Sequence, residues 1–206
     1  MVAKRSLQIF YLPNKKDLLL KQINAMSSIV AIVGRPNVGK STFFNRMIQK
    51  REAIVDAISG VTRDRHYGKS DWNGRTFTLI DTGGYVEGSE DIFQKEIDKQ
   101  VNLAIEEADV IIFMVDVADG VTGMDQTIAS LLRKAQKPVF LAINKVDNAL
   151  REQDTPEFYE LGFDQFYTLS SVSGSGTGEL LDALITKLPE EVEKPEDILQ
   201  IGRAHV

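Results

Sequence analysis

One octapeptide decides the fold class: Gly34-Arg35-Pro36-Asn37-Val38-Gly39-Lys40-Ser41. It fits the pattern G-x-x-x-x-G-K-[ST] of a phosphate-binding loop, which requires a strand before it and a helix after it. The β-branched run Ile29–Val33 supplies the strand, and a helix is predicted from Lys40. Glycines let backbone N–H groups curl around a phosphate, and the helix N-terminus adds positive potential. We therefore expect Lys40 to reach the β- and γ-phosphates of a nucleotide and Ser41 to supply a hydroxyl to Mg²⁺.

Around this loop, predicted strands alternate with predicted helices. Short apolar runs predict strands at Ile29–Val33, Tyr67–Trp72, Arg75–Ile80, Val110–Val115, Val139–Ile143 and Phe166–Leu169. Apolar residues at helical spacing predict helices over Lys40–Gln49, around Phe93–Ile105, over Met124–Ala135 and over Glu179–Leu188. This order predicts an α/β fold of the P-loop NTPase class, with a mostly parallel six-stranded sheet and helices on both faces. The dipeptide Asn73-Gly74 predicts a hairpin, which adds one antiparallel edge strand.

A second motif, Asp81-Thr82-Gly83-Gly84, follows the predicted strand that ends at Ile80. In a parallel sheet this carboxylate lies next to the phosphate loop, where it can hold Mg²⁺ through water. The flexible glycine pair lets a backbone N–H swing toward a γ-phosphate. Asp81 is therefore a candidate magnesium residue, and Gly84 is a candidate contact for the γ-phosphate.

A third motif, Asn144-Lys145-Val146-Asp147, follows the predicted strand Val139–Ile143 and indicates which base is bound. Guanine presents two donors, N1–H and N2–H₂, whereas adenine has an acceptor in place of N1–H. Asp147 can accept both guanine donors and would repel the adenine acceptor, and such a site rejects the wrong partner by about 10⁴-fold. We expect Asn144 to brace the loop and the base, and the stem of Lys145 to lie over the ring face. The motif therefore favours guanine.

Composition and charge exclude several other classes of protein. The chain has 206 residues, a formal net charge of −6, no cysteine, and two histidines, His66 and His205. Without cysteine there is no disulfide, no cysteine-ligated zinc site and no thiol nucleophile, and a multi-histidine metal site is not expected. The negative charge argues against a protein that coats DNA or an anionic membrane. Because no apolar run approaches the roughly 18 residues that cross a bilayer, we expect a cytoplasmic protein.

Both ends of the chain differ from the middle. Residues 1–25 carry five basic side chains and one acidic side chain and match no signal-peptide pattern. We expect a non-native or disordered extension there, with an amphipathic membrane anchor as the alternative. Residues 189–206 are acidic and then lose any pattern, which predicts a linker and the truncated tail of a longer protein. The nucleotide-binding domain is predicted between them, over residues 26–188.

The motifs together resemble those of the Era-like translation-associated GTPases, whose signature also includes the sequence GVTRDR, present here at Gly60–Arg65. Over about Met26–Leu188 the chain looks like the first GTPase domain of the EngA (Der) family, in which two such domains stand in tandem before a KH-like domain. The resemblance implies a Ras-like GTPase domain that hydrolyses GTP to GDP and phosphate with Mg²⁺. It also implies a switch in assembly of the large ribosomal subunit, with ribosome contacts through family domains that lie outside this sequence.

Further site residues are implied by the resemblance alone. Thr62 corresponds to the switch threonine whose hydroxyl joins Ser41 on Mg²⁺. Asn37 corresponds to an asparagine that binds K⁺ where other GTPases place an arginine finger. Tyr85 stands where Ras-type GTPases have the glutamine that orients the attacking water. The base-side loop, usually Ser-Ala, is Ser170-Ser171 here, and a backbone N–H of this loop is expected on guanine O6.

The predicted guanine-nucleotide site thus combines several stretches of the chain. Catalytic roles are expected for Asn37, Lys40, Thr62 and Gly84, and metal contacts for Ser41, Thr62 and Asp81 with Mg²⁺ and for Asn37 with K⁺. GTP contacts are expected from Gly34, Arg35, Pro36, Asn37, Val38, Gly39, Lys40, Ser41, Asp81, Thr82, Gly83, Gly84, Tyr85, Asn144, Lys145, Val146, Asp147, Ser170 and Ser171. Two alternatives stay open: a nucleotide-gated binding module with negligible turnover, and another Era-like GTPase, such as one in tRNA modification.

Overall fold

The structure, a computed structural model, describes residues 28–48, 66–83 and 90–189, with the backbone alone described at 90–96. All of these residues belong to one compact unit, Ser28–Glu191. Among the helices of these described ranges, none is both long enough and apolar enough to cross a membrane.

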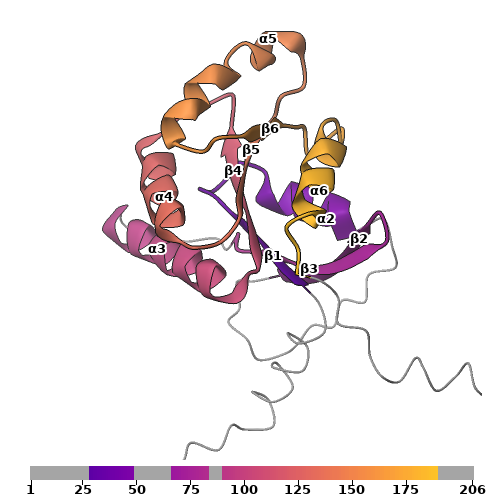
Figure 1. Ribbon diagram of the computed structural model, residues 1–206. Coiled ribbons are helices and arrows are strands. Elements are labelled where there is room, and N and C mark those ends of the chain that lie inside the picture. The colour runs from indigo at the N-terminus through magenta and orange to yellow at the C-terminus, as the bar shows by residue number, and fades with distance from the viewer. Residues whose placement is uncertain (1–27, 49–65, 84–89, 190–206) are drawn as a thin grey trace, which may run out of the picture. The chain divides into compact units, whose positions relative to one another are not determined.

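A six-stranded sheet forms the centre of this unit, in the order β2-β3-β1-β4-β5-β6 (Figure 1). Its strands are β1 Ser28–Val33, β2 His66–Trp72, β3 Arg75–Asp81, β4 Val110–Asp116, β5 Val139–Asn144 and β6 Phe166–Thr168. Strands β2 and β3 pair antiparallel, and the other neighbouring strands pair parallel. The predicted α/β fold, with its single antiparallel edge strand, is confirmed.

Helices cover both faces of the sheet (Figure 1). They are α2 Lys40–Ile48, α3 Glu90–Glu107, α4 Gly123–Lys134, the short α5 Ala149–Glu152, the 3₁₀ helix η1 Thr155–Leu161, and α6 Thr177–Ile185. Helix α4 begins at a capping box, in which Thr122 and Asp125 each bond to the backbone of the other. Because both faces are covered, every residue of β4 is buried, as is usual for a central parallel strand.

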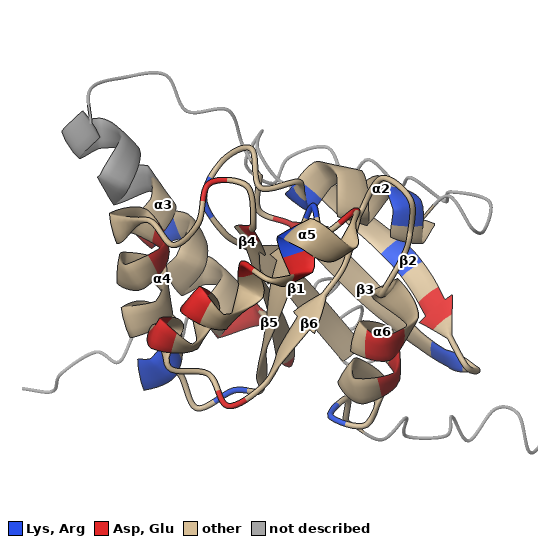
Figure 2. Cartoon of the chain, turned by 90° about the horizontal axis from the view of Figure 1, so that it is seen from above, with Lys and Arg blue, Asp and Glu red and all other residues tan. Residues whose placement is uncertain are grey.

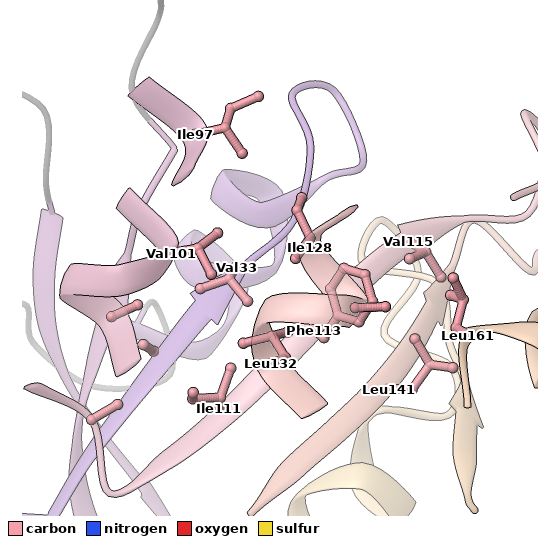
Figure 3. Close-up of a cluster of buried hydrophobic side chains, with 14 of the residues drawn as sticks. Val33, Ile97, Val101, Ile111, Phe113, Val115, Ile128, Leu132, Leu141 and Leu161 are labelled. Atoms are coloured by element: carbon pink, nitrogen blue, oxygen red, sulfur yellow. The ribbon is translucent and has the colours of Figure 1, made fainter. Parts of the chain in front are cut away.

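The side chains of β1 alternate between two hydrophobic cores. Val33 points into the core formed with α3, α4 and η1, which also contains Val101, Ile128, Leu161 and the fully buried Phe113 (Figure 3). Its neighbour Ile32 points into the other core, which is formed with α2 and α6. The two cores hold β1 and β3 in place, and the phosphate-binding loop therefore begins at a strand that is packed on both faces.

Most strands and helices agree with their predicted ranges to within one residue at each end, and α3 is longer than predicted by three residues at its start and two at its end. Two further differences concern one helix and one connection. Helix α6 runs over Thr177–Ile185 instead of Glu179–Leu188, because Gly176, with φ of 71°, starts the helix two residues earlier. Leu188 is still buried, although it lies beyond the helix. The connection from β5 to β6 contains α5 and η1, which the sequence did not predict. Both are so short that they leave no hydrophobic repeat.

The tip of the β2–β3 hairpin is attached to α6. Asn73 and Gly74 both have positive φ, 47° and 81°, as the predicted tight turn requires. Asp182, one of the acidic residues that Figure 2 marks on α6, accepts hydrogen bonds from Trp72 Nε1 at 2.7 Å and Asn73 Nδ2 at 2.9 Å. These two hydrogen bonds fix the turn between β2 and β3 to helix α6, so the end of the edge strand β2 is held by a neighbouring element.

Candidate functional site

The three predicted motifs meet at the carboxyl edge of the sheet. Parallel pairing places Ile32 of β1 beside Asp81 of β3, and Asp116 of β4 beside Asn144 of β5. Ligands of open α/β sheets bind outside the carboxyl ends of the strands. This edge is therefore the candidate nucleotide site.

The phosphate-binding loop between β1 and α2 is tightly packed against its neighbours. Gly34 and Gly39 have φ of 152° and 101°, a conformation that L side chains rarely adopt. A Cβ on Gly34 would overlap the Met114 carbonyl, and a Cβ on Gly39 would overlap the side-chain amide of Asn144. Val38 is fully buried and anchors the loop in the core. Only glycine fits at positions 34 and 39, and these two glycines allow the tightly curved backbone that a phosphate-binding loop requires.

Lys40 is folded back onto this loop. Its ammonium group donates to the carbonyl oxygens of Gly34 and Arg35, each at 2.8 Å. The side chain is buried, and this desolvation lowers the pKa of Lys40 from 10.5 to about 8, with Asp81 opposing the shift and Arg35 adding to it. Among the described residues both of its hydrogen-bond partners are carbonyl oxygens, so this buried ammonium group is well placed to receive an anionic phosphate.

Arg35 ties the loop to the start of α4. Its Nη2 lies 2.7 Å from Asp119 Oδ2, and its Nε lies 3.3 Å from Oδ2 of the fully buried Asp125. The Arg35 guanidinium holds the pKa of the Asp119 carboxyl below its usual range. In this structure the side chain of Arg35 therefore supports the phosphate loop, and its carbonyl supports Lys40.

Asp81 and Ser41 border one small space beside Gly83. A Cβ on Gly83 would lie 2.9 Å from Asp81 Oδ1 and 3.3 Å from Ser41 Oγ. Asp81 Oδ1 accepts the Gly83 N–H at 2.8 Å, whereas its Oδ2 is buried with no hydrogen-bond partner within the described ranges. Such an oxygen is costly to bury, and a hydroxyl beside it adds a second oxygen of the kind that Mg²⁺ prefers. These two residues fit a magnesium ion, while Thr82 turns back to β1, its Oγ1 donating to Ile32 O at 2.8 Å.

Asn144 joins the phosphate loop to the two base-side loops. Its Nδ2 donates to Val38 O at 2.7 Å, and its Oδ1 accepts from Ser171 N at 2.9 Å and Ser171 Oγ at 3.0 Å. The side chain is almost completely buried. The predicted bracing of the loop by Asn144 is therefore visible in the structure. Ser170 and Ser171 are buried as well, and the Ser170 N–H donates to Ser175 O at 3.0 Å. Their predicted contact with guanine O6 stays a prediction.

Lys145 and Asp147 extend from the end of β5. Lys145 has a left-handed backbone, with φ of 67°, and its ammonium group forms an ion pair with the buried carboxylate of Asp116. The Asp147 side chain is 54% exposed and lies 3.5 Å from Arg151 Nη1, which also donates to Lys145 O at 2.8 Å. Asn148 Nδ2 donates to Asp147 at 3.0 Å. The carboxylate predicted to read guanine is thus accessible and oriented by two neighbours.

Some predicted residues lie outside the described ranges, and some residues of the site were not predicted. Thr62, Gly84 and Tyr85 belong to the first group. Asp116 and Arg151 belong to the second. Asp116 could have been predicted from the sequence, because it is an acidic residue directly after the apolar run 110–115. No sequence pattern points to Arg151, which lies in the short helix α5.

The profile of the 50S ribosome-binding GTPase family matches residues 29–145, from β1 to the lysine of the base motif. The chain belongs to this family. Among curated proteins, it is 67% identical over 177 residues to GTPase Der of Flavobacterium johnsoniae, covering 86% of this chain and 40% of that protein. It is also 67% identical over 174 residues to GTPase Der of Christiangramia forsetii, covering 84% and 40%. The predicted resemblance to the EngA (Der) family is confirmed, and the chain spans about two fifths of the length of these relatives.

Solved structures of GTPases share the fold of this family member. Aquifex aeolicus Era bound to GDP and AlF₄⁻ aligns with a TM-score of 0.64 at 30% identity, over 84% of this chain and 60% of that chain. The G domain of the T. maritima FeoB iron transporter aligns with a TM-score of 0.58 at 26% identity, over 78% and 98%. The predicted Ras-like GTPase fold is therefore confirmed.

Proposed function

We propose that this chain binds GTP and hydrolyses it to GDP and phosphate. The observation that carries the proposal is the meeting of three groups at one sheet edge. They are the phosphate loop with Lys40, the Asp81 oxygen that has no hydrogen-bond partner among the described residues, and the base motif, which Asn144 joins to the phosphate loop. Membership of the 50S ribosome-binding GTPase family supports it, as does the GDP·AlF₄⁻ bound to the similar Era. The domain is proposed to span residues 26–188.

Lys40 would bind and stabilise the phosphates. Its ammonium group already lies inside the loop, between two carbonyl oxygens that are weaker partners than phosphate. When phosphate enters, the charge of Lys40 and the N–H groups at the start of α2 face the oxygens on which negative charge grows during transfer. Preorganised donors of this kind stabilise the transition state without reorganising, and this effect is usually the largest single contribution to catalysis.

Ser41 and Asp81 would hold Mg²⁺, with Thr62 as the third predicted ligand. When bound, such an ion would neutralise part of the negative charge of the phosphates. The chain's own contribution is the placement of two oxygens beside one space, fixed by α2 and by β3. Thr62 and Gly84 are proposed to complete the γ-phosphate side.

Asp147 would select guanine. Its carboxylate is accessible, and Arg151 and Asn148 orient it. Because adenine would place an acceptor against this carboxylate, ATP should be rejected. The backbone of Ser170-Ser171 is proposed to contact guanine O6.

Asn37 is proposed to bind K⁺ during hydrolysis. The residue is exposed, and its φ of 65° lies in the left-handed region. Its amide oxygen suits a hard cation, whose charge would act where other GTPases use an arginine. We expect GTP hydrolysis at least tenfold faster in K⁺ than in Na⁺ at equal ionic strength, measured under single-turnover conditions. Asn37→Ala should remove the difference, and equal rates in the wild type would contradict the assignment.

The activity itself is tested by incubating the chain with GTP or ATP and Mg²⁺ and measuring released phosphate. We expect release from GTP alone, abolished in Lys40→Ala. GTP binding without measurable release would favour the alternative, a nucleotide-gated binding module. Equal turnover of GTP and ATP would contradict the assignment of the base motif.

The whole protein is proposed to act as a cytoplasmic switch in assembly of the large ribosomal subunit. This rests on the family description and on the relatives named GTPase Der, which favour this role over that of an Era-like GTPase in tRNA modification. Co-sedimentation of the full-length protein with 50S subunits, with GDP or a non-hydrolysable GTP analogue, tests it. No association in either nucleotide state would reject the proposal.

A further inference from the structure

Arg46 connects the phosphate-loop helix to the loop that follows β6. It lies in the last turn of α2 and is half-buried. Its Nε donates to Ser171 O at 2.6 Å, and its Nη2 donates to Val172 O. The guanidinium also lies against Gly174, where a Cβ would come within 2.7 Å of Nη1. One arginine side chain thus contacts three residues of a loop 125 positions away in the sequence.

This loop, residues 170–176, is fixed from several sides. Ser170 O accepts the Gly174 N–H at 2.7 Å, so the carbonyls of three successive residues, 170 to 172, are all hydrogen-bonded. From the inner side, Asn144 accepts both donors of Ser171. Arg46 supplies the bonds to the outer two carbonyls. Without it, the peptide units after Ser171 and Val172 would lose these side-chain partners.

We propose that Arg46 is a positioning residue for guanine recognition. The inference rests on the proposed binding of a guanine nucleotide at this edge. Lys40 and Arg46 lie on one helix, six residues or about 9 Å apart along its axis. The same rigid element therefore presents the phosphate ligand at its start and holds the base-side loop near its end. Arg46 sets the distance and orientation between the two halves of the site.

The geometry of the peptide unit explains the effect on the base. In a trans peptide the C=O and N–H point in opposite directions. When Arg46 holds the Ser171 carbonyl toward α2, the Val172 N–H is turned to the opposite side, away from α2. Two carbonyls are held by one planar guanidinium fork, which a lysine ammonium group cannot reproduce. Loss of the fork frees both peptide units and thereby loosens the loop whose Ser170-Ser171 backbone is proposed to contact guanine O6.

The test compares a ligand that has the base with one that lacks it. Calorimetric titration of the full chain with Mg²⁺-GDP and with Mg²⁺-pyrophosphate measures both halves of the site. Arg46→Ala should weaken GDP binding about tenfold or more and change pyrophosphate binding less than twofold. Equal losses for the two ligands, or no loss for GDP, would overturn the proposal.

Arg133→Ala is the matched control. Arg133 of α4 likewise donates to a loop carbonyl, Leu161 O, and lies against a glycine of positive φ, Gly162. Its loop is not among the predicted nucleotide contacts, so neither affinity should change. A second variant, Arg46→Lys, keeps the charge and the fold but not the fork, and its GDP affinity should stay below that of the wild type. Full recovery in Arg46→Lys would overturn the role of the fork. Failure of the wild type itself to prefer GDP over ADP would instead refute the proposed function.

Discussion

Raising the pH from about 7 to about 9 should weaken GDP binding through Lys40. In the structure burial lowers the pKa of this side chain to about 8, and its only hydrogen-bond acceptors in the phosphate loop are two carbonyl oxygens. Bound phosphates stabilise the charged ammonium group and therefore raise its pKa. Above pH 8 the free protein must take up a proton in order to bind.

The size of the effect follows from linkage. With a pKa of about 8 in the free state, and one clearly above 9 in the complex, the dissociation constant rises about tenfold between pH 7 and 9. At pH 8.5 about three quarters of a proton is taken up for each GDP bound.

The lowered pKa of Lys40 also affects folding. The unfolded chain keeps the proton up to a pKa near 10.5 and the folded chain loses it near 8, so the contribution of Lys40 to the free energy of unfolding is least favourable below pH 8 and becomes more favourable between these two values. Below pH 8 the burial of the charged Lys40 lowers the free energy of unfolding by about 3 kcal/mol.

Calorimetry in buffers of different ionisation enthalpy measures the proton uptake directly. Lys40→Arg is the control, because a guanidinium stays charged throughout this range and its GDP affinity, however weak, should not depend on pH. Side-chain NMR of the free protein identifies the titrating lysine as the signal that this variant lacks. A wild-type affinity that is constant from pH 7 to 9, or a Lys40 signal that titrates near 10.5, would refute the reasoning.

Three further changes test the base, the loop and the core. Asp147→Asn replaces one acceptor oxygen by a donor, so binding should shift from GTP to xanthosine triphosphate; unchanged GTP affinity in a titration would remove Asp147 from the site. Gly34→Ala would drive a Cβ into the Met114 carbonyl at a φ of 152°, and should destabilise the fold by about 2–4 kcal/mol in urea unfolding; wild-type stability would show that the loop can shift. Phe113→Ala, at a fully buried position of β4, should cost about 3–5 kcal/mol, and a much smaller loss would mean that the core collapses around the gap.

The sequence by itself determined the class of the fold and the candidate residues of the site. Both follow from local patterns: Gly34–Ser41 fits a phosphate-binding loop, the motif that contains Asp147 favours guanine, and Asn73-Gly74 favours a tight hairpin turn. The order of strands and helices then leaves few topologies, because parallel crossovers are right-handed and helices must cover both faces. The short elements α5 and η1 were not predicted, because they bury too few residues to produce a hydrophobic repeat in the sequence.

Only the tertiary structure decided how the separate motifs become one site. Asn144 reaches Val38 across 106 residues, Arg46 reaches Ser171 across 125, and Lys145 pairs with Asp116 of the neighbouring strand. Each of these contacts depends on which strands are neighbours and on how far each helix extends, and no local pattern carries that information. The lowered pKa of Lys40 has the same origin, because burial by segments distant in sequence, and not the residue type, removes water from its charge.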